Sequence, residues 1–417
     1  MRENKRLEYK ENMESGTFLK TISAYANYGG GKIIFGIADD GTVKGISKPE
    51  EACLNLENKI NDSIKPVPEY SIEIGEDSTI ILSVCEGPYK PYLYKGKAYK
   101  RYDSAATEVD RLEYGRLILE GQNQSYEELP SSMQELTFDR LEEELKKSLG
   151  ITCLNKDILK TLELYSEKRG FNNAAALLAD RNQFPGIDMI RFGSSIDEIM
   201  DRATFEHMSV LAQLSSCIEM FQTYYQYEKI EGVERKQIDK IPEKAFREAI
   251  ANALVHRAWD VRASIKISMF EDRIEISSPG GLPAGIGREE YLNGQISVLR
   301  NPILGNVFFR LKYIEKFGTG IMRINRSYSN ALEKPSYQIF ENSIQVVLPV
   351  IASDEKLSEK DKKILDIIRD KGTVSRSEIE KLAGIGKDST IRSLNLLLKK
   401  HIIEKTGAGR GVKYHIR

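Results

Sequence analysis

The sequence has few cysteines and few histidines, and neither residue type is spaced as in a metal centre. The four cysteines are Cys53, Cys85, Cys153 and Cys217, and no two of them have the C-x₂-C spacing of zinc or redox sites. Only four histidines occur along the chain. We therefore expect reduced thiols in a cytosolic protein, and no metal chemistry that depends on several histidines.

Long apolar runs are also missing. The N-terminal residues carry charges throughout, unlike a signal peptide. The longest apolar runs, residues 33–37 and 79–85, have the length of strands and are too short to cross a bilayer. We therefore expect a cytoplasmic, soluble protein without a membrane partner.

The chain has almost no net charge, but its charges are unevenly distributed. Its 417 residues include 61 Lys+Arg and 62 Asp+Glu, which excludes a uniformly basic coat for nucleic acid. Residues 354–417 nevertheless hold 16 Lys+Arg and 10 Asp+Glu, so this end is basic. At about 150 residues per domain, the length predicts two to four domains.

Helix and strand patterns alternate near the N-terminus. We expect helices at residues 14–28 and 50–64, the first ended by Gly29-Gly30-Gly31. Strands are expected, as two hairpins, at residues 32–38, 43–46, 70–74 and 79–86. The polar segment 125–135 marks a domain boundary.

The middle of the chain is expected to be mainly helical first and mixed later. The helical pattern runs from residue 137 to 226 with an interruption at 180–192, and a strong helix follows at 241–259. A hairpin at 263–277 and a strand at 343–350 complete this part.

Two glutamates and two aspartates near the N-terminus are candidate metal ligands. Glu3 and Glu8 lie five residues apart, and Asp39 or Asp40 follows a buried strand. Carboxylates of this kind can hold divalent ions that activate water at a phosphodiester, with Lys10 offsetting charge nearby. The alternative is that Asp39 and Asp40 only form the turn that they favour, and that Glu3 is poorly ordered at the terminus.

The string from Glu3 to Lys10, followed by Ala26-Asn27-Tyr28-Gly29-Gly30-Gly31, closely resembles the Schlafen AlbA-like domain over residues 1 to about 120. In active Schlafens two such glutamates and a later aspartate form a metal-dependent nuclease triad. The resemblance thus implies Mg²⁺ or Mn²⁺ and an RNA or DNA substrate. Many relatives are instead only nucleic-acid-binding or regulatory.

Five tyrosines and five basic residues interleave over residues 89–102. Rings and cations on one face of a strand suit stacked bases and phosphates. The candidate nucleic-acid contacts are Lys90, Tyr94, Lys95, Lys97, Lys100 and Arg101. The alternative is a tyrosine-rich core hairpin with a solvated basic face.

Three pieces between residues 241 and 325 indicate a nucleotide pocket. Glu248, Asn252 and His256 share one helix face, where a carboxylate and an amide can orient water and a magnesium ion. Gly280 and Gly281 follow a strand, and glycines around Thr319 open a helix whose N–H groups suit phosphate. The alternative is a structural turn beside an amphipathic helix.

This order of motifs resembles the GHKL (Bergerat) ATPase fold over roughly residues 170–350. The resemblance implies ATP as the cofactor, Glu248 as the carboxylate that positions water, and Asn252 as a magnesium ligand. The adenine-reading D-x-G-x-G motif is replaced by residues 277–281, Ser-Ser-Pro-Gly-Gly. The candidate cofactor residues are Glu248, Asn252, Arg257, Gly280, Gly281, Asn301, Gly318, Thr319 and Gly320.

The C-terminal pattern is typical of a winged helix-turn-helix. Three helices are expected, with N-terminal caps at Ser358, Ser375 and Asp388-Ser389. They precede two strands, at 402–405 and 412–416. Such a fold binds DNA through the start of its recognition helix and its wing, although it also serves as a docking or dimerisation module. The candidate DNA contacts are Lys387, Ser389, Thr390, Arg392, Arg410 and Lys413.

These patterns predict an α+β multidomain protein with a Schlafen AlbA-like α/β domain (1–124), a helical connector (125–169), a GHKL-like α/β sandwich (170–352) and a winged helix (353–417). The favoured function is an ATP-gated transcriptional regulator that binds nucleic acid as a homodimer or higher homo-oligomer. The alternatives are an endoribonuclease acting on tRNA or against phage, and a GHKL ATPase that drives an assembly cycle.

Overall fold

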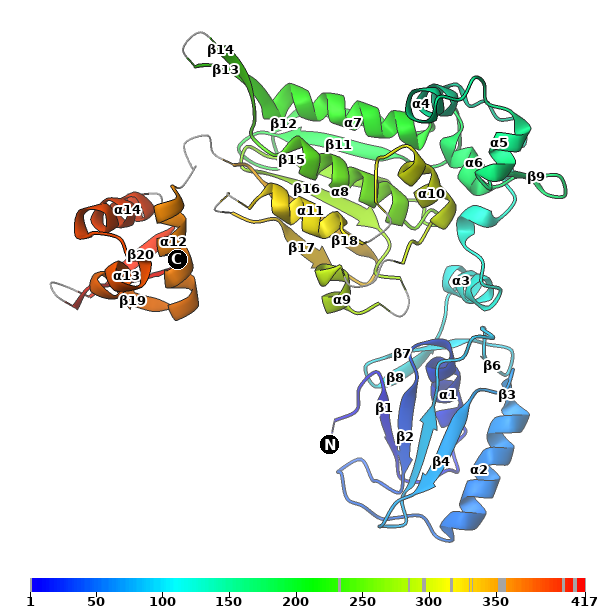
Figure 1. The fold of residues 1–417 in the computed structure, drawn as a ribbon. Coiled ribbons are helices and arrows are strands. Elements are labelled where there is room, and N and C mark those ends of the chain that lie inside the picture. Colours follow the sequence, from blue (N-terminus) through cyan, green and yellow to red (C-terminus); the bar gives the residue numbers. More distant parts are fainter. Residues whose placement is uncertain are drawn as a thin grey trace. The chain divides into compact units, whose positions relative to one another are not determined.

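The structure is a computed structural model that describes residues 2–231, 234–283, 286–294, 298–315, 318–329, 331, 333–351, 358–399, 402–407 and 411–416 (Figure 1). The chain divides into two compact units. One comprises Met1–Ser132 and Glu167–Ala174, and the other comprises Met133–Ser166 and Ala175–Arg417. The finer division into four domains stays a prediction. The mixture of helices and sheets confirms the α+β class.

The first unit is built on a four-stranded sheet with the strand order β1-β2-β5-β4 (Figure 1). Its strands are β1 (Leu7–Lys10), β2 (Gly31–Phe35), β4 (Tyr70–Ile74) and β5 (Ile80–Val84). β1 runs parallel to β2, and the other neighbours are antiparallel. Ile22, Ile33 and Leu82 are fully buried in the core between this sheet and its helices, α1 (Phe18–Asn27) and α2 (Pro49–Ser63).

Shorter elements complete this part of the chain. They are β3 (Ile64–Lys65) paired with β6 (Leu93–Tyr94), β7 (Tyr99–Tyr102) paired with β8 (Ala105–Glu108), α3 (Arg111–Gly121) and a 3₁₀ turn at Tyr126–Glu128. In sequence there follow α4 (Asp139–Leu149), α5 (Lys156–Thr161), β9 (Tyr165–Ser166), β10 (Gly170–Phe171) and α6 (Asn173–Leu178).

The expected hairpin between residues 32–38 and 43–46 is wrong. β2 ends at Phe35 and pairs with β1 and β5, while Ile37 and Val43 form only an isolated bridge. Gly36 has φ of +94°, a backbone conformation outside the strand region, so the chain leaves the sheet there.

The second unit contains a six-stranded sheet with the order β12-β11-β15-β16-β18-β17. The strands are β11 (Ile187–Phe192), β12 (Ile199–Phe205), β15 (Ile265–Met269), β16 (Arg273–Pro279), β17 (Ser336–Ile339) and β18 (Ser343–Pro349). Figure 1 shows the helices α7 (Val210–Tyr225), α8 (Glu243–His256) and α11 (Gly320–Ser327) on one face of this sheet. Ile250 of α8 and Ile276 of β16 are buried between the layers.

The remaining elements of this unit are a hairpin of β13 (Gln226–Glu231) and β14 (Glu234–Asp239), and the helices α9 (Arg288–Asn293) and α10 (Pro302–Arg310). β12 lies in a segment that we expected to be helical. It is an edge strand whose side chains are mostly exposed, so it lacks the apolar alternation that identifies a half-buried strand.

The last part of the chain has helices α12 (Glu359–Lys371), α13 (Arg376–Ala383) and α14 (Lys387–Lys399). Strands β19 (Thr373–Ser375), β20 (Ile403–Thr406) and β21 (Lys413–Ile416) form a sheet with the order β19-β21-β20. The capping boxes at Ser358 and Ser375 are confirmed. The third cap is wrong, because α14 begins at Lys387 and Asp388 already lies in its first turn. None of the described helices is long and apolar enough to cross a membrane.

Candidate functional site

The start of α11 packs against the polar face of α8. The Asn252 side-chain amide donates a hydrogen bond to Glu248 Oε1 at 3.4 Å. A Cβ atom on Gly320 would lie 2.6 Å from Asn252 Nδ2 and 2.8 Å from Glu248 Oε1. Gly318, with φ of +67°, and Thr319 lead into this contact. The structure therefore brings the predicted carboxylate, amide and glycine turn together.

Glu248 is a buried carboxylate that lies beside the guanidinium of Arg323. Only 8% of the residue is exposed, and burial raises the pKa of its carboxyl group, which the charge of Arg323 and the Asn252 amide partly offset. Arg323 Nη1 lies 4.0 Å from Glu248 Oε2, and Arg323 Nη2 lies 3.2 Å from Glu315. A carboxyl group that titrates closer to neutral pH is suited to exchanging protons with a nearby water.

A small cavity of about 40 Å³ lies between α8 and the sheet. Asn252, His256 and Gly280 line it, together with Ser278 and Tyr291. Gly280 has φ of +108°, and a Cβ there would lie 2.9 Å from Ala258 Cβ, so a larger residue does not fit. The Ser278 hydroxyl donates to the Ala253 carbonyl at 2.9 Å. The strand end that carries the adenine-reading aspartate in the GHKL motif thus holds serines.

Three of the predicted cofactor residues contact the protein's own backbone: Gly281, Arg257 and Asn301. A Cβ on Gly281 would lie 2.1 Å from the Glu341 carbonyl oxygen. Arg257 is fully buried, donates to the carbonyl groups of Pro185 and Ala263, and stacks on Trp259. Burial lowers the pKa of its guanidinium to about 10. We therefore correct its predicted role in cofactor binding.

Asn301 needs the same correction. Its side-chain amide donates to the carbonyl oxygens of Val255 at 2.7 Å and Arg257 at 2.8 Å, and only 1% of the residue is exposed. It thereby caps the C-terminal end of α8. The sequence does not predict this capping role, because the partners of Asn301 are backbone carbonyl oxygens, which no motif identifies.

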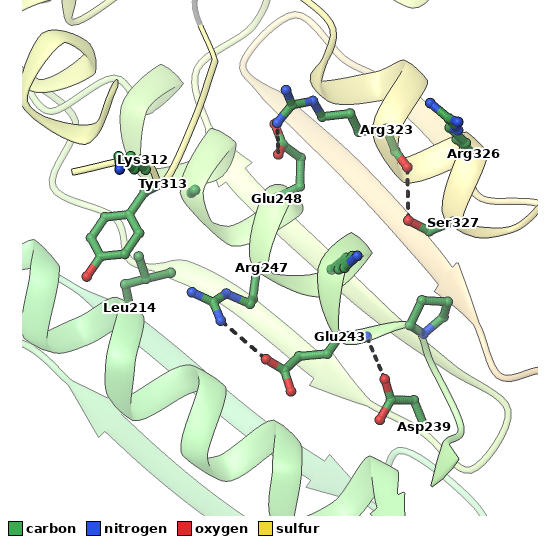
Figure 2. A pocket seen from close by; sticks show the side chains of 13 residues that line it. Leu214, Asp239, Glu243, Arg247, Glu248, Lys312, Tyr313, Arg323, Arg326 and Ser327 are labelled. Carbon is green, nitrogen blue, oxygen red and sulfur yellow. Dashed lines mark hydrogen bonds and ion pairs between the residues drawn. The ribbon is translucent and has the colours of Figure 1, made fainter. Parts of the chain in front are cut away.

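A larger cavity of about 1040 Å³ lies beside α8 and α11 (Figure 2). None of its five basic residues was predicted from the sequence: Lys244, Arg247, Lys312, Arg323 and Arg326. They come from three separate segments and form no motif. The only sequence signal is the helical spacing of Lys244, Arg247 and Glu248 along one face of α8.

In the first unit, Glu3 and Glu8 converge on Arg101. Arg101 Nη2 lies 3.2 Å from Glu3, and Nη1 lies 3.2 Å from Glu8. Lys10 Nζ lies 2.8 Å from the other Glu8 oxygen. Only 2% of the Arg101 side chain is exposed. Arg101 therefore holds the two carboxylates as a buried ion cluster, which corrects its predicted contact with nucleic acid.

Asp39 and Asp40 do not join this cluster. Glu8 pairs with Ile33 inside the sheet, whereas the aspartates are exposed in the turn beyond the end of β2. Asp40 accepts a hydrogen bond from the Thr42 amide at 2.8 Å, the turn role that we gave as the alternative. Within the described residues no group of three His, Cys, Asp or Glu side chains could hold a metal ion. Nuclease activity stays a prediction.

The tyrosine and lysine segment packs largely against the core, but its strands β6 and β7 pair with β3 and β8 and not with each other. Tyr94 and Tyr99 are buried, which corrects the predicted base contact at Tyr94. Lys90 pairs with Glu86 and Glu120, Lys97 with Glu108, and Lys100 with Glu113. Lys95 is exposed and lies over the Tyr94 ring. The alternative of a tyrosine core with a solvated basic face therefore describes this segment better.

Part of the predicted recognition surface on α14 is exposed. Lys387 and Arg392 face solvent, Ser389 is half-buried, and Lys413 is exposed on β21. Thr390 is fully buried and donates to the Ile385 and Gly386 carbonyl oxygens, which corrects its predicted DNA contact. Arg410 lies outside the described residues.

Two sequence families match separate parts of the chain. Residues 3–110 match the family described as Schlafen, AlbA_2, and residues 262–348 match the family described as putative ATP-dependent DNA helicase recG C-terminal, HATPase_c_4. These matches confirm the predicted Schlafen AlbA-like and GHKL-like regions. The second match includes Gly280 and Gly320 but begins after Glu248 and Asn252. Together the families indicate nucleotide and nucleic-acid binding.

No curated protein matches the sequence. Among solved structures, the crystal structure of the DIP2311 protein from Corynebacterium diphtheriae is similar, with 18% sequence identity and a TM-score of 0.49. The similarity covers 99% of this chain and 92% of that chain. It supports no argument about function at this TM-score.

Proposed function

We propose that the chain is an ATP-binding regulator of nucleic-acid binding. In this proposal a nucleotide beside α8 changes the affinity for nucleic acid of the Schlafen AlbA-like region (residues 1–124) and of the winged helix (353–417). The two family matches support nucleotide and nucleic-acid binding. The gating itself, the role in regulation and a homo-oligomeric state are our proposals.

The observation that carries the proposal is the contact of Gly320 with Glu248 and Asn252. A helix N-terminus without a Cβ at its first residue lies against a carboxylate and an amide. The N–H groups of such a helix start suit phosphate oxygens. The Glu248 and Asn252 oxygens are the hard ligands that Mg²⁺ or Mn²⁺ prefers, and such an ion would neutralise phosphate charge there.

The base would lie at the small cavity on the other side of Asn252, which has to widen to hold a purine because about 40 Å³ is little more than the volume of one water molecule. Ile276, Ile321 and Val346 give that cavity apolar walls, and Gly280 lets the backbone come close to a flat ring. Since serines stand where the adenine-reading carboxylate is expected, we expect weak discrimination between ATP and GTP.

Calorimetric titration of the full-length protein with ATP and Mg²⁺ tests this proposal. We expect Asn252→Ala to raise the Kd for ATP by about tenfold or more, because a lost polar contact of about 1.4 kcal/mol has that effect. The matched control is Asn395→Ala, an exposed asparagine of α14. The proposal fails if the unmodified protein does not bind ATP, or if Asn252→Ala binds ATP as tightly as the control.

A further inference from the structure

α8 separates two cavities. The small cavity, beside the proposed nucleotide site, is lined by Ala249, Asn252, Ala253 and His256. The large cavity is lined by Lys244, Arg247, Glu248 and Ala251. No described residue lines both cavities, although Glu248 and Asn252, four residues apart, are neighbours on the helix surface. The large cavity is therefore a second site, distinct from the pocket that contains Asn252.

The other walls of the large cavity add more cations than anions. Arg323 and Arg326 come from α11, and Lys312 and Tyr313 follow α10 (Figure 2). Asp239, at the end of β14, and Glu243, at the start of α8, supply the remaining carboxylates. Five basic side chains thus face three acidic ones, which gives the cavity a positive field.

The acidic residues of the cavity already have donors. The Glu243 carboxylate accepts from Arg247 at 3.4 Å and from Gln226 at 2.8 Å, and these bonds lower the pKa of Glu243 against the effect of burial. Asp239 accepts from Gln226 and from the Glu243 amide. Glu248 faces Arg323. Figure 2 shows the Arg247–Glu243, Glu243–Asp239 and Arg323–Glu248 contacts.

Three of the basic residues have no such partner. Among the residues that the structure describes, Lys244, Lys312 and Arg326 make no ion pair, and all three are exposed. Lys312 also has φ of +61°, a left-handed conformation that is usual for Gly or Asn just after a helix. The cations left without a partner therefore belong to the cavity and come from α8, from the segment after α10 and from α11.

We propose that the large cavity beside α8 and α11 binds a small ligand that carries several phosphates, in addition to the nucleotide beside Asn252. Arg and Lys side chains recognise phosphate by charge-assisted hydrogen bonds. A volume of about 1040 Å³ is at the upper end for small-molecule sites and accommodates such a ligand. The proposal goes beyond the proposed function, because it concerns a different cavity from the one beside Asn252.

The ligand site is coupled to the nucleotide site through Glu248. This carboxylate contacts Arg323 on the side of the large cavity and Asn252 on the side of the small one. A polyanion that attracts Arg323 would weaken its ion pair with Glu248 and so alter the surroundings of Asn252. Any effect of one ligand on the affinity of the other is then reciprocal.

Inorganic tripolyphosphate is the probe for this site, and calorimetry of the full-length protein is the readout. We expect Lys312→Ala combined with Arg326→Ala to weaken tripolyphosphate binding by about tenfold or more while leaving the fold intact by circular dichroism. Lys381→Ala, an exposed lysine of α13, is the control for lost surface charge. Asn252→Ala should keep its affinity for tripolyphosphate.

Two results would overturn the proposal. One is that the unmodified protein does not bind tripolyphosphate. The other is that Asn252→Ala loses tripolyphosphate while the Lys312 and Arg326 double variant retains it, which would assign the phosphates to the nucleotide site. If the unmodified protein binds tripolyphosphate but not ATP, the proposed function is refuted and this site stands.

Discussion

At the scale of single residues, Arg101 holds the two N-terminal carboxylates, Glu3 and Glu8, in ion pairs. Its guanidinium joins Glu3 and Glu8, which precede it by 98 and 93 residues, and it also donates to the Asn4 carbonyl at 3.1 Å. The residues that resemble a metal-binding pair are thus neutralised by a buried cation and by Lys10. This part of the site is a structural cluster.

Arg101→Met should strongly destabilise the first unit. Removing one partner of a buried ion cluster leaves an unpaired charge and costs about 3–5 kcal/mol. Urea unfolding followed by circular dichroism measures the change. Lys97→Met is the matched control, because Lys97 pairs with Glu108 at the surface, where a pair contributes little to stability.

A second substitution separates the ion cluster from simple packing. Adding Glu8→Gln to Arg101→Met removes the more deeply buried of the two carboxylates that lose Arg101, and it should recover part of the lost stability. Equal stability of Arg101→Met and Lys97→Met would contradict the burial of this cluster.

His256 makes the second unit sensitive to acid. Burial and the charge of Arg300 lower the pKa of His256 to about 4, against about 6.5 in an unfolded chain. As the pH falls from 6.5 to 4, the unfolded chain binds a proton that the folded protein does not. The contribution of neutral His256 to the stability of the fold is therefore complete above about pH 6.5 and is lost as the pH falls from 6.5 to 4.

His256→Gln should reduce this loss. Between pH 7 and pH 4.5 the unmodified protein should lose about 2–3 kcal/mol more stability than the variant. Urea unfolding at both pH values gives the comparison, and the carboxylates common to both proteins cancel in the difference. The same pH dependence in both proteins would show that the pKa of His256 is no lower in the folded protein than in the unfolded chain.

At the scale of elements, the close approach of α11 to α8 is the feature on which the proposed nucleotide site depends. Gly320→Ala would place a methyl group against the Asn252 and Glu248 side chains. We expect α11 to shift and the affinity for ATP to fall by about tenfold or more. Gly115→Ala is the control, since a Cβ on this glycine of α3 meets nothing within 4 Å.

The control variant Gly115→Ala also has an expected effect on stability. An alanine within a helix is favoured over glycine by about 0.5–1 kcal/mol, so Gly115→Ala should bind ATP normally and unfold at a slightly higher temperature. Unchanged ATP affinity in Gly320→Ala would show that this contact does not shape the nucleotide site.

The elements predicted correctly are those whose signals are local. α8 and the capping boxes of α12 and α13 depend on residues three and four apart, which the sequence displays directly. β1 and β12 were missed because their strands depend on partners elsewhere in the chain: β1 pairs with β2, and β12 is an exposed edge strand. Similarly, no spacing in the sequence links Arg101 to Glu3, or Lys312 to Arg326.

At the scale of the whole molecule, the neutral composition conceals regions of different character. The exposed Lys387 and Arg392 belong to the basic C-terminal part, while the lysines near Tyr94 are mostly paired with glutamates. Of the two basic regions in the sequence, the C-terminal one therefore offers the better surface for phosphates. The family matches add a nucleotide-binding region between the two ends of the chain.

The most direct test of the account is the Kd of the full-length protein for duplex DNA, measured at one salt concentration with and without saturating ATP and Mg²⁺. The account predicts that ATP changes this Kd by about fivefold or more, and that Asn252→Ala abolishes the change while Asn395→Ala preserves it. Lys387→Ala with Arg392→Ala should weaken binding in both states. An identical Kd with and without bound ATP would contradict the claim that the nucleotide gates nucleic-acid binding.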